Sequence, residues 1–446
     1  MKKILILLFT VIWAISFIFM GVGCKAPAEE EVTPAEEVVV EEEAVVEEEV
    51  AEPIQVGHLS YHTGPFGHVG PQFDGATNFP IDLINENPPL GRMVTAIHQD
   101  IGTIGEPAAA MKLVQNQKVE VLLNPAHEYM AYRDWILKYI EDHGRPMMPS
   151  VHGGAIDRQY GGTPEEPMFR GAPMDSTQGV AAVIQAQEAG AKSVVVMASE
   201  TAGMQMQQEA AAKAAEELGM TVLLQIDFLP EQTSYRSEVS KAQGENPEAL
   251  LVFGAAEDGG VIVKNAAELG MSLIIIGATD WLFEEFPKTA TMSAINQHKA
   301  VWAVGFTYAD TPAWDFYERE WNNSVYAGLS DAANSYTMQY YDILNVTMLA
   351  IQAAGTTEAG KWAEYVEVVA EGPGKKVYTY QEGIEALKNG EEIDYSGVTG
   401  EMNYTDTGVV GGSYGVYEWE DTTTMNRVNV IEGQPILDLD SKIFED

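Results

Sequence analysis

The chain has 446 residues and carries 67 acidic against 25 basic side chains, a formal net charge of −42 at pH 7. A field of this sign repels phosphate backbones and anionic lipid, which excludes nucleic acid as a partner. Its one cysteine, Cys24, excludes an intramolecular disulfide and a zinc site built from cysteines. The length beyond residue 53 and the apolar content of 46% suit two globular lobes.

The first 24 residues have the pattern of an export signal. Lys2 and Lys3 precede the apolar run 4–20, and small residues at 21–23 come directly before Cys24. A basic head, an apolar stretch and a small-residue end are typical of a secretory signal peptide. An uncleaved membrane helix is the alternative, because the run is near the minimum length of a span. In either case we expect the rest of the chain to be exported.

Because this pattern ends on the only cysteine, it resembles the lipobox of bacterial lipoproteins. The resemblance implies that Cys24 becomes the lipidated first residue of the mature protein, although Gly21 stands where that family usually has an aliphatic residue. Residues 25–53 are glutamate clusters separated by Val, Ala and Pro, with no aromatic residue. Such a self-repelling composition predicts a disordered tether, with an acidic interaction tail as the alternative.

From residue 54 onward, short apolar runs alternate with helical patterns. The expected strands cover residues 54–59, 93–97, 119–123, 146–149, 193–198, 222–226, 250–253, 273–276 and 300–306. One expected helix ends near residue 84. The others cover residues 107–115, 130–141, 178–189, 205–218, 235–242, 260–269, 314–322 and 337–354. This alternation predicts parallel βαβ units, and its restart after Asp175 predicts two doubly wound α/β lobes. The Gly- and Tyr-rich stretch 400–430 has β character and predicts hinge strands.

Several different short motifs follow one another along this part of the chain. They are 63–67 (TGPFG), 84–85 with 90–92 (IN and LGR), Asp100, 111–114 (MKLV) with 118–119, Arg170, Asp175, 178–179, 341–342 (YD), Gly397, Gly400, Gly408 and 417–419 (YEW). In order and spacing the chain resembles the type I periplasmic binding proteins, specifically the leucine/isoleucine/valine-binding receptors of ABC transporters. No single motif is diagnostic, but together they extend from Ile54 to Val430.

The resemblance implies two Rossmann-like lobes joined by a multi-strand hinge. Residues 54–173 and 307–410 are expected to form the N-terminal lobe, and residues 174–306 and 411–446 the C-terminal lobe. The implied function is capture of a small polar solute, such as an amino acid, an amide or a related organic acid, for the permease subunits of an ABC transporter. The implied location is outside the cytoplasm, with a lipid anchor in the membrane. The resemblance implies neither a cofactor nor a catalytic residue.

Ligands of open α/β sheets bind beyond the carboxyl ends of the strands, where loops and helix N-termini offer free N–H groups. The positions that bind the ligand in the resembled family correspond to candidates in this sequence. In the first lobe the candidates are His68, Val69, Ala126, His127, Glu128, Ser150 and His152. The second-lobe candidates are Ala256, Asp258, Asp280 and Trp281.

Asp280 falls where the branched-chain receptors have an acidic residue for the ligand amine. An acid after Gly-Ala-Thr at a strand end also suits a helix cap, and both interpretations stay open. Trp281 suits either a pocket wall or the core.

Three departures from the family speak against leucine-type specificity. The hydroxyl cluster that would hold a carboxylate is replaced by residues 126–128 (AHE), a threonine by His152, and an aromatic residue by Ala256. Glu128 would repel an anionic ligand unless it were protonated or turned away. Amino-acid-like ligands therefore remain the expectation, but leucine does not.

Four histidines, His62, His68, His127 and His152, fall on predicted strand-end loops of the first lobe. Imidazoles in one cleft can bind a metal or hydrogen-bond a polar ligand. Their spacing matches no metal-binding motif, so we expect no metal and a role in binding an organic ligand.

An enzyme is the main competing class. Residues 411–415 (GGSYG) fit the nucleophile motif G-x-S-x-G, but that motif needs a strand–turn–helix context and a later histidine. The last histidine is His298, and Ser413 falls among predicted strands, so the hydrolase interpretation is rejected. A sensor that presents its solute to a signalling partner stays open beside the transport receptor.

Overall fold

The computed structural model describes residues 51–444 except 65–66, 127, 152–155 and 157. The predicted signal peptide, Cys24 and the tether up to residue 50 lie outside the described residues, and so do His127 and His152. The chain from Ala51 onward forms one compact unit. None of the helices in the described ranges combines the length and the hydropathy that a membrane span needs.

The first lobe is built on short parallel strands. Strand β1 (Ile54–Ser60) lies between β2 (Val94–Asp100) and β3 (Val121–Leu123). Strand β4 (Met148–Ser150) joins β3 through a parallel bridge and pairs with β5 (Met168–Arg170). The connecting helices are α1 (Gly70–Ile84), α2 (Glu106–Met111), which continues as a π-helical turn, and α3 (Tyr129–His143). This is the parallel βαβ arrangement that the strand–helix alternation predicts.

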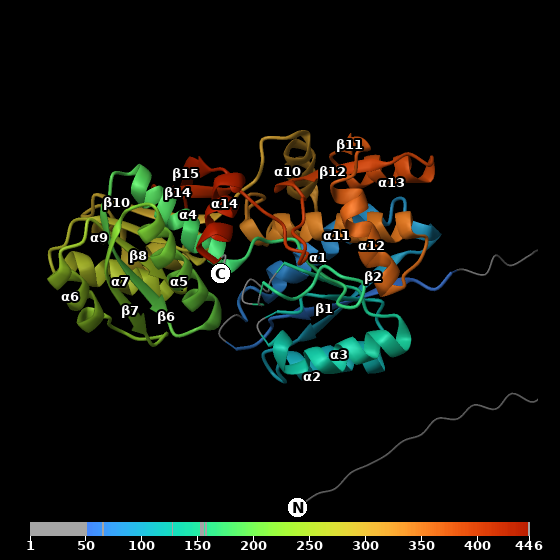
Figure 1. Cartoon of the computed structure of the whole chain (residues 1–446), viewed down its shortest axis with the longest axis horizontal. Coiled ribbons are helices and arrows are strands. Elements are labelled where there is room, and N and C mark those ends of the chain that lie inside the picture. Colours follow the sequence, from blue (N-terminus) through green and yellow to red (C-terminus); the bar gives the residue numbers. More distant parts are fainter. Residues whose placement is uncertain (1–50, 65–66, 127, 152–155, 157, 445–446) are drawn as a thin grey trace, which may run out of the picture. The chain divides into compact units, whose positions relative to one another are not determined.

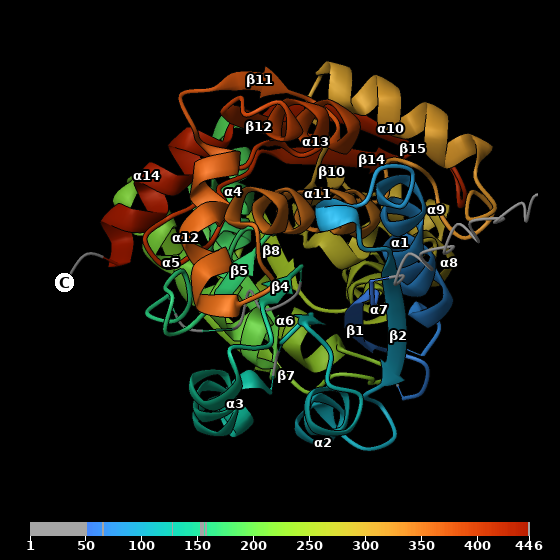
Figure 2. The same cartoon turned by 90° about the vertical axis from the view of Figure 1, so that its right-hand side faces the viewer.

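Later chain returns to the same lobe. Helix α11 (Ser335–Ala354) packs along α1, and α12 (Ala359–Ala370) and α13 (Tyr380–Lys388) pack on α11. In Figures 1 and 2, α2 and α3 lie on one side of β1, and α11 and α12 on the other. Helix α10 (Pro312–Asn323) covers Phe79 of α1, and a small sheet joins β11 (Lys375–Val377), β12 (Ile393–Gly397) and β13 (Gly400–Glu401). One hydrophobic core therefore combines residues 54–169 with residues 340–410.

The second lobe contains a seven-stranded sheet in the order β15-β14-β10-β9-β8-β6-β7. Its strands are β6 (Ser193–Ser199), β7 (Thr221–Phe228), β8 (Ala249–Phe253), β9 (Ile274–Gly277), β10 (Ala300–Phe306), β14 (Tyr414–Trp419) and β15 (Met425–Ile431). The five strands from β6 to β10 are parallel, and β14 and β15 add to β10 in antiparallel order.

Helices cover both faces of this sheet. They are α4 (Asp175–Glu188), α5 (Ala202–Glu217), α6 (Arg236–Glu245), α7 (Ala256–Glu268) and α14 (Gly433–Phe444). Val194 and Val196 belong to the core shared with α4 and α5, whereas Val195 belongs to the core shared with α6 and α7. Successive side chains of a strand point to opposite faces, so a continuous apolar strand buries both sides at once.

The structure confirms the predicted fold class, two doubly wound α/β lobes. The sequence analysis did not identify β5, α12, α13 and α14, or the short helices α8 (Glu285–Ala290) and α9 (Met292–Ile295) that precede β10. The lobe boundaries at 173, 306 and 410 stay predictions.

Packing in the second lobe predicts a strong effect at one helical glycine. The indole of Trp281 lies so close to Gly259 of α7 that an added Cβ would be 2.1 Å from its Nε1 atom. We expect Gly259→Ala to lower the free energy of unfolding by about 1–3 kcal/mol, because the enclosed ring has to shift. Gly244 of α6 has no atom within 4 Å of an added Cβ, and Gly244→Ala is expected to be neutral or to stabilise by up to about 1 kcal/mol. Urea unfolding of both variants tests the contrast; equal midpoints would contradict it.

Candidate functional site

The loop between β1 and α1 presents two of the predicted binding residues differently. His68 is exposed, whereas Val69 is buried immediately before α1. The Val69 carbonyl accepts the N–H of Phe73 at 3.0 Å, which forms the first turn of the helix. Val69 is therefore a packing residue at the helix start, and His68 is free to face a ligand.

The backbone donors after β3 are already occupied by a side chain. The buried carboxylate of Glu106 accepts the N–H of Ala126 at 2.7 Å, the N–H of Glu128 at 3.0 Å and the hydroxyl of Tyr132 at 2.7 Å. Glu128 in turn accepts the N–H of Glu106 at 3.1 Å. A ligand carboxylate at these two N–H groups would have to displace Glu106. His127, between them, lies outside the described residues.

The predicted residue after β4 joins two strand ends. Ser150 is fully buried, and its hydroxyl donates to the Pro125 carbonyl at 2.8 Å. This bond connects the end of β4 to the loop after β3, so Ser150 shapes the strand-end surface from beneath.

At the start of α7, Ala256 and Asp258 are both buried. One carboxylate oxygen of Asp258 accepts the Tyr235 hydroxyl at 2.5 Å and the Glu231 N–H at 2.9 Å. Burial raises the pKa of Asp258. Its contacts hold the loop between β7 and α6 against α7, which is a structural role within the second lobe.

Trp281 is enclosed in the second lobe. Its side chain is fully buried and stacks on Phe286 with ring centroids 4.3 Å apart, and its carbonyl accepts the indole N–H of Trp419 at 2.9 Å. Of the two interpretations of Trp281, a pocket wall or a core residue, the structure shows the core residue.

Asp280 lies where elements of both lobes meet. It is half-buried in the short 3-10 helix Thr279–Leu282 after β9, and the hydroxyl of Tyr336, from α11 of the first lobe, donates to it at 3.4 Å. The helix-cap alternative does not describe it, since Ala278 begins this turn and Glu284 precedes α8.

The electrostatic surroundings of Asp280 are mainly acidic. Burial, the largest effect, and the nearby charge of Asp175 raise the pKa of Asp280 to about 6, and Glu257 acts in the same direction. A positive charge on His68 acts in the opposite direction. Of the predicted binding residues, His68 and Asp280 therefore lie close enough for a charge on one to affect the pKa of the other.

Aromatic side chains that the sequence analysis did not select surround this point. Tyr336 stacks on Phe283 with centroids 6.1 Å apart and contacts Phe73 of α1 at 5.5 Å. Tyr61, next to the loop histidines, is 6.2 Å from Phe73. No local pattern separates these rings from core residues, and only the approach of α1, α11 and the Asp280 turn brings them together.

A polar cluster of Asp74 with three histidines lies inside the first lobe. Asp74 of α1 contacts His58 and His98, and its second oxygen contacts His62 at 3.1 Å. Although burial acts in the opposite direction, hydrogen bonds with His58, His98 and Ser60 hold the pKa of Asp74 well below its usual range. Burial lowers the pKa of His58 to about 4, so this imidazole is neutral at pH 7. His62 thus lies with Asp74, a partner that its sequence position did not indicate.

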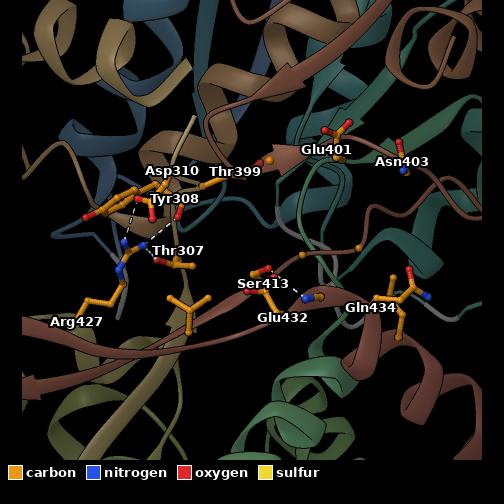
Figure 3. A pocket seen from close by; sticks show the side chains of 17 residues that line it. Thr307, Tyr308, Asp310, Thr399, Glu401, Asn403, Ser413, Arg427, Glu432 and Gln434 are labelled. Carbon is orange, nitrogen blue, oxygen red and sulfur yellow. Dashed lines mark hydrogen bonds and ion pairs between the residues drawn. The ribbon is translucent and has the colours of Figure 1, made fainter. Parts of the chain in front are cut away.

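A cavity of about 570 Å³ lies elsewhere (Figure 3). It is lined by three connecting segments, 307–310, 399–403 and 411–413, and by residues 427–437. Arg427 donates to the Thr307 hydroxyl at 2.9 Å and lies 4.0 Å from the centre of the Tyr308 ring, so its charge already has partners. Of the predicted binding residues that the structure describes, none lines this cavity. We therefore regard this cavity as a feature of the connecting segments, separate from the predicted binding residues at the strand ends.

Comparisons with known proteins agree with this architecture. Residues 53–424 match the family described as "Periplasmic binding protein". No curated protein sequence matches the chain. A leucine binding protein from Thermotoga maritima is 19% identical, with 86% of this chain and 99% of that chain covered and a TM-score of 0.66.

Two further solved structures have the same fold. The branched-chain amino acid transporter substrate binding protein of Streptococcus pneumoniae, in complex with isoleucine, is 17% identical, covers 85% of this chain and 99% of its own, and has a TM-score of 0.65. A solute binding protein from R. palustris, in complex with benzoate, is 13% identical, covers 85% and 97%, and has a TM-score of 0.64.

The two α/β lobes have the fold of the type I periplasmic binding proteins. The family match covers most of the sequence, and the chain belongs to the periplasmic binding protein family. Membership implies a location outside the cytoplasm.

Proposed function

We propose that this protein is the substrate-binding lipoprotein of an ABC transporter and holds one small polar solute between its lobes for hand-over to the permease. The contact between Asp280 and Tyr336 is the main support. A half-buried carboxylate of the second lobe there meets a hydroxyl of the first lobe. In a two-lobed receptor, a ligand bound at such a point would be buried from both sides when the lobes close.

The charges near Asp280 favour a ligand with an amine or an amide over a simple anion. Asp175 and Glu257 both add negative charge there, and the N–H groups of Ala126 and Glu128 are taken by Glu106. An ammonium group would offset the acidic field, whereas a carboxylate would find these two N–H groups occupied. The isoleucine and benzoate in the similar structures are ligands of those proteins; for this chain an amino acid or amide is the first choice and an organic acid the second.

We further propose that Cys24 is lipidated after signal cleavage and that the acidic stretch after it is a tether. The single cysteine makes this easy to test. Metabolic labelling with palmitate should mark the wild-type protein and not Cys24→Ala, and equal labelling of both would contradict the proposal.

A thermal-shift screen against amino acids, amides, ureas and aromatic acids tests the binding function. A ligand that binds only the folded state at 100 times its Kd adds about 2.7 kcal/mol to the stability. We expect one chemical class to raise the melting temperature, without conversion of the compound, and saturating ligand to make the scattering profile more compact. A compound that is chemically converted, or a profile that stays unchanged under saturation, would contradict a binding protein that closes.

A further inference from the structure

Three polar side chains converge inside the first lobe because of strand register. His58 of β1 and His98 of β2 are direct partners in the parallel pairing, so their side chains leave the sheet on the same face. Helix α1 crosses this face and contributes Asp74. The ligand atoms of the three residues all lie within 4.8 Å of one another.

The distances within this group are those of a metal-binding face. The Nδ1 atoms of His58 and His98 are 2.9 Å apart, and Asp74 Oδ1 lies 3.5 Å from the first and 3.1 Å from the second. Ligand atoms arranged tetrahedrally at about 2.0–2.1 Å from a zinc ion are about 3.3–3.4 Å from each other. The three atoms therefore already have the spacing of one face of such a tetrahedron.

The far sides of both rings are bonded in a way that directs Nδ1 toward the group. His98 Nε2 contacts the Asn78 side-chain oxygen at 3.3 Å. His58 Nε2 contacts the Tyr340 hydroxyl at 3.1 Å. Outer hydrogen bonds of this kind orient the histidines of metal sites. Both Nδ1 atoms thus face Asp74 Oδ1, and a proton on Nδ1 or a cation in its place can satisfy the group.

The carboxylate is oriented as well, and the group can be reached from outside. Ser60 donates its hydroxyl to Asp74 Oδ1 at 2.7 Å, while His62 contacts Oδ2 at 3.1 Å. The Asp100 carboxylate holds the loop of His62 by accepting its N–H at 2.9 Å. His58 is fully buried, but the side chain of Asp74 is 21% exposed and that of His62 is 36% exposed. A hydrated cation can therefore enter past these two residues.

We propose that His58, Asp74 and His98 bind a divalent transition-metal cation, with Zn²⁺ as its representative, inside the first lobe. Two imidazole nitrogens and one carboxylate oxygen are a ligand set that zinc uses, with a fourth position left for water or another ligand. Phe73, which precedes Asp74, contacts both Tyr336 and Tyr340. Tyr336 donates to Asp280 and Tyr340 contacts His58, so the proposed metal site and the proposed solute site use different side chains.

The test uses the chain from residue 51 onward, which forms one compact unit. Protein stripped with EDTA is titrated with Zn²⁺ by calorimetry, and with Co²⁺ while its visible absorption is recorded. We expect Zn²⁺ binding to saturate at one equivalent per chain and the melting temperature to rise with Zn²⁺. The visible absorption of bound Co²⁺ should be that of an ion with fewer than six ligands.

His98→Ala and Asp74→Asn should weaken Zn²⁺ binding by more than about 100-fold, because loss of an outer partner alone costs about 10–100-fold. His62→Ala should weaken it by about 10-fold. His143→Ala is the matched control, since His143 stacks on Tyr139 of its own helix, away from the cluster. Melting in EDTA shows whether each variant folds.

Absence of stoichiometric Zn²⁺ binding to the wild type, or binding to His98→Ala with wild-type affinity, would overturn the proposal. The first result would mean that a shared proton satisfies the two nitrogens. The solute screen in EDTA is a separate readout, so failure of the metal site and failure of the transport function are distinguishable.

Discussion

Asp280→Asn is expected to raise the free energy of unfolding at pH 8 by about 1–3 kcal/mol while it weakens the binding of an amine-bearing ligand. Burial and the charge of Asp175 raise the pKa of Asp280 from 3.8 to about 6. Between these two values the folded protein binds more protons than the unfolded chain, so the Asp280 contribution to stability falls as the pH rises through this window. Above about pH 6 the carboxylate is charged in the folded protein as well, and its full destabilising effect on the folded state is present. Asparagine removes it and keeps an oxygen for Tyr336.

Urea unfolding at pH 4 and pH 8 measures this effect. The difference between Asp280→Asn and wild type should be close to zero at pH 4 and largest at pH 8. Asp134→Asn, at a fully exposed carboxylate, should show no comparable dependence. For a ligand with an ammonium group, loss of the charged partner should weaken affinity by about 30-fold or more. Unchanged affinity for such a ligand would remove Asp280 from the site.

Asp342→Ala is expected to have the largest effect on stability, a loss of about 3–5 kcal/mol. Asp342 is fully buried on α11. Its oxygens accept the Tyr395 hydroxyl at 2.9 Å, the Val398 N–H at 2.9 Å, and both the N–H and the hydroxyl of Thr399 at 2.7 Å. Alanine would leave all four donors without this acceptor, and β12 with the segment after it would lose its attachment to α11.

The backbone of Gly397 packs directly against the Asp342 carboxylate. A Cβ added at Gly397 would lie 2.2 Å from Asp342 Oδ1, so the backbone approaches the carboxylate as only glycine permits. Chemical unfolding measures the loss, with Asp438→Ala as the control. Asp438 is exposed, and its carboxylate accepts a hydrogen bond from Gln434 one helical turn away, so its replacement should change the free energy of unfolding by no more than about 0.5 kcal/mol. Similar midpoints for the two variants would contradict the role given to Asp342.

The fold class of both lobes could be predicted from the amino-acid sequence. Apolar runs of four to seven residues alternating with helical patterns are local signals, and parallel βαβ units are what such alternation forms. The same local signals became ambiguous after residue 354, where α12 and α13 pack on an earlier lobe and the preceding strand–helix rhythm no longer applies. The short strand β5 has three residues and no periodicity to detect.

Individual site residues depended on tertiary structure. The resemblance to a family selected Asp280, but its neighbours Tyr336 and Phe73 come from helices far away in the chain. Asp258 has the same kind of strand-end position as Asp280, yet its carboxylate is bonded within its own lobe. Position relative to a strand end therefore indicates which residues can face a cleft, and the packing of the neighbouring loops decides which of them do.

The histidines show this division most clearly. Local pattern selected His62 and His68 as loop residues, but His58 and His98 lie inside strands and look like ordinary strand positions in the sequence. They are 40 residues apart, and only the register of β1 against β2 places them side by side under Asp74. Periodicity along one segment can predict an element and its buried face, whereas register and helix placement result from the packing of all segments together.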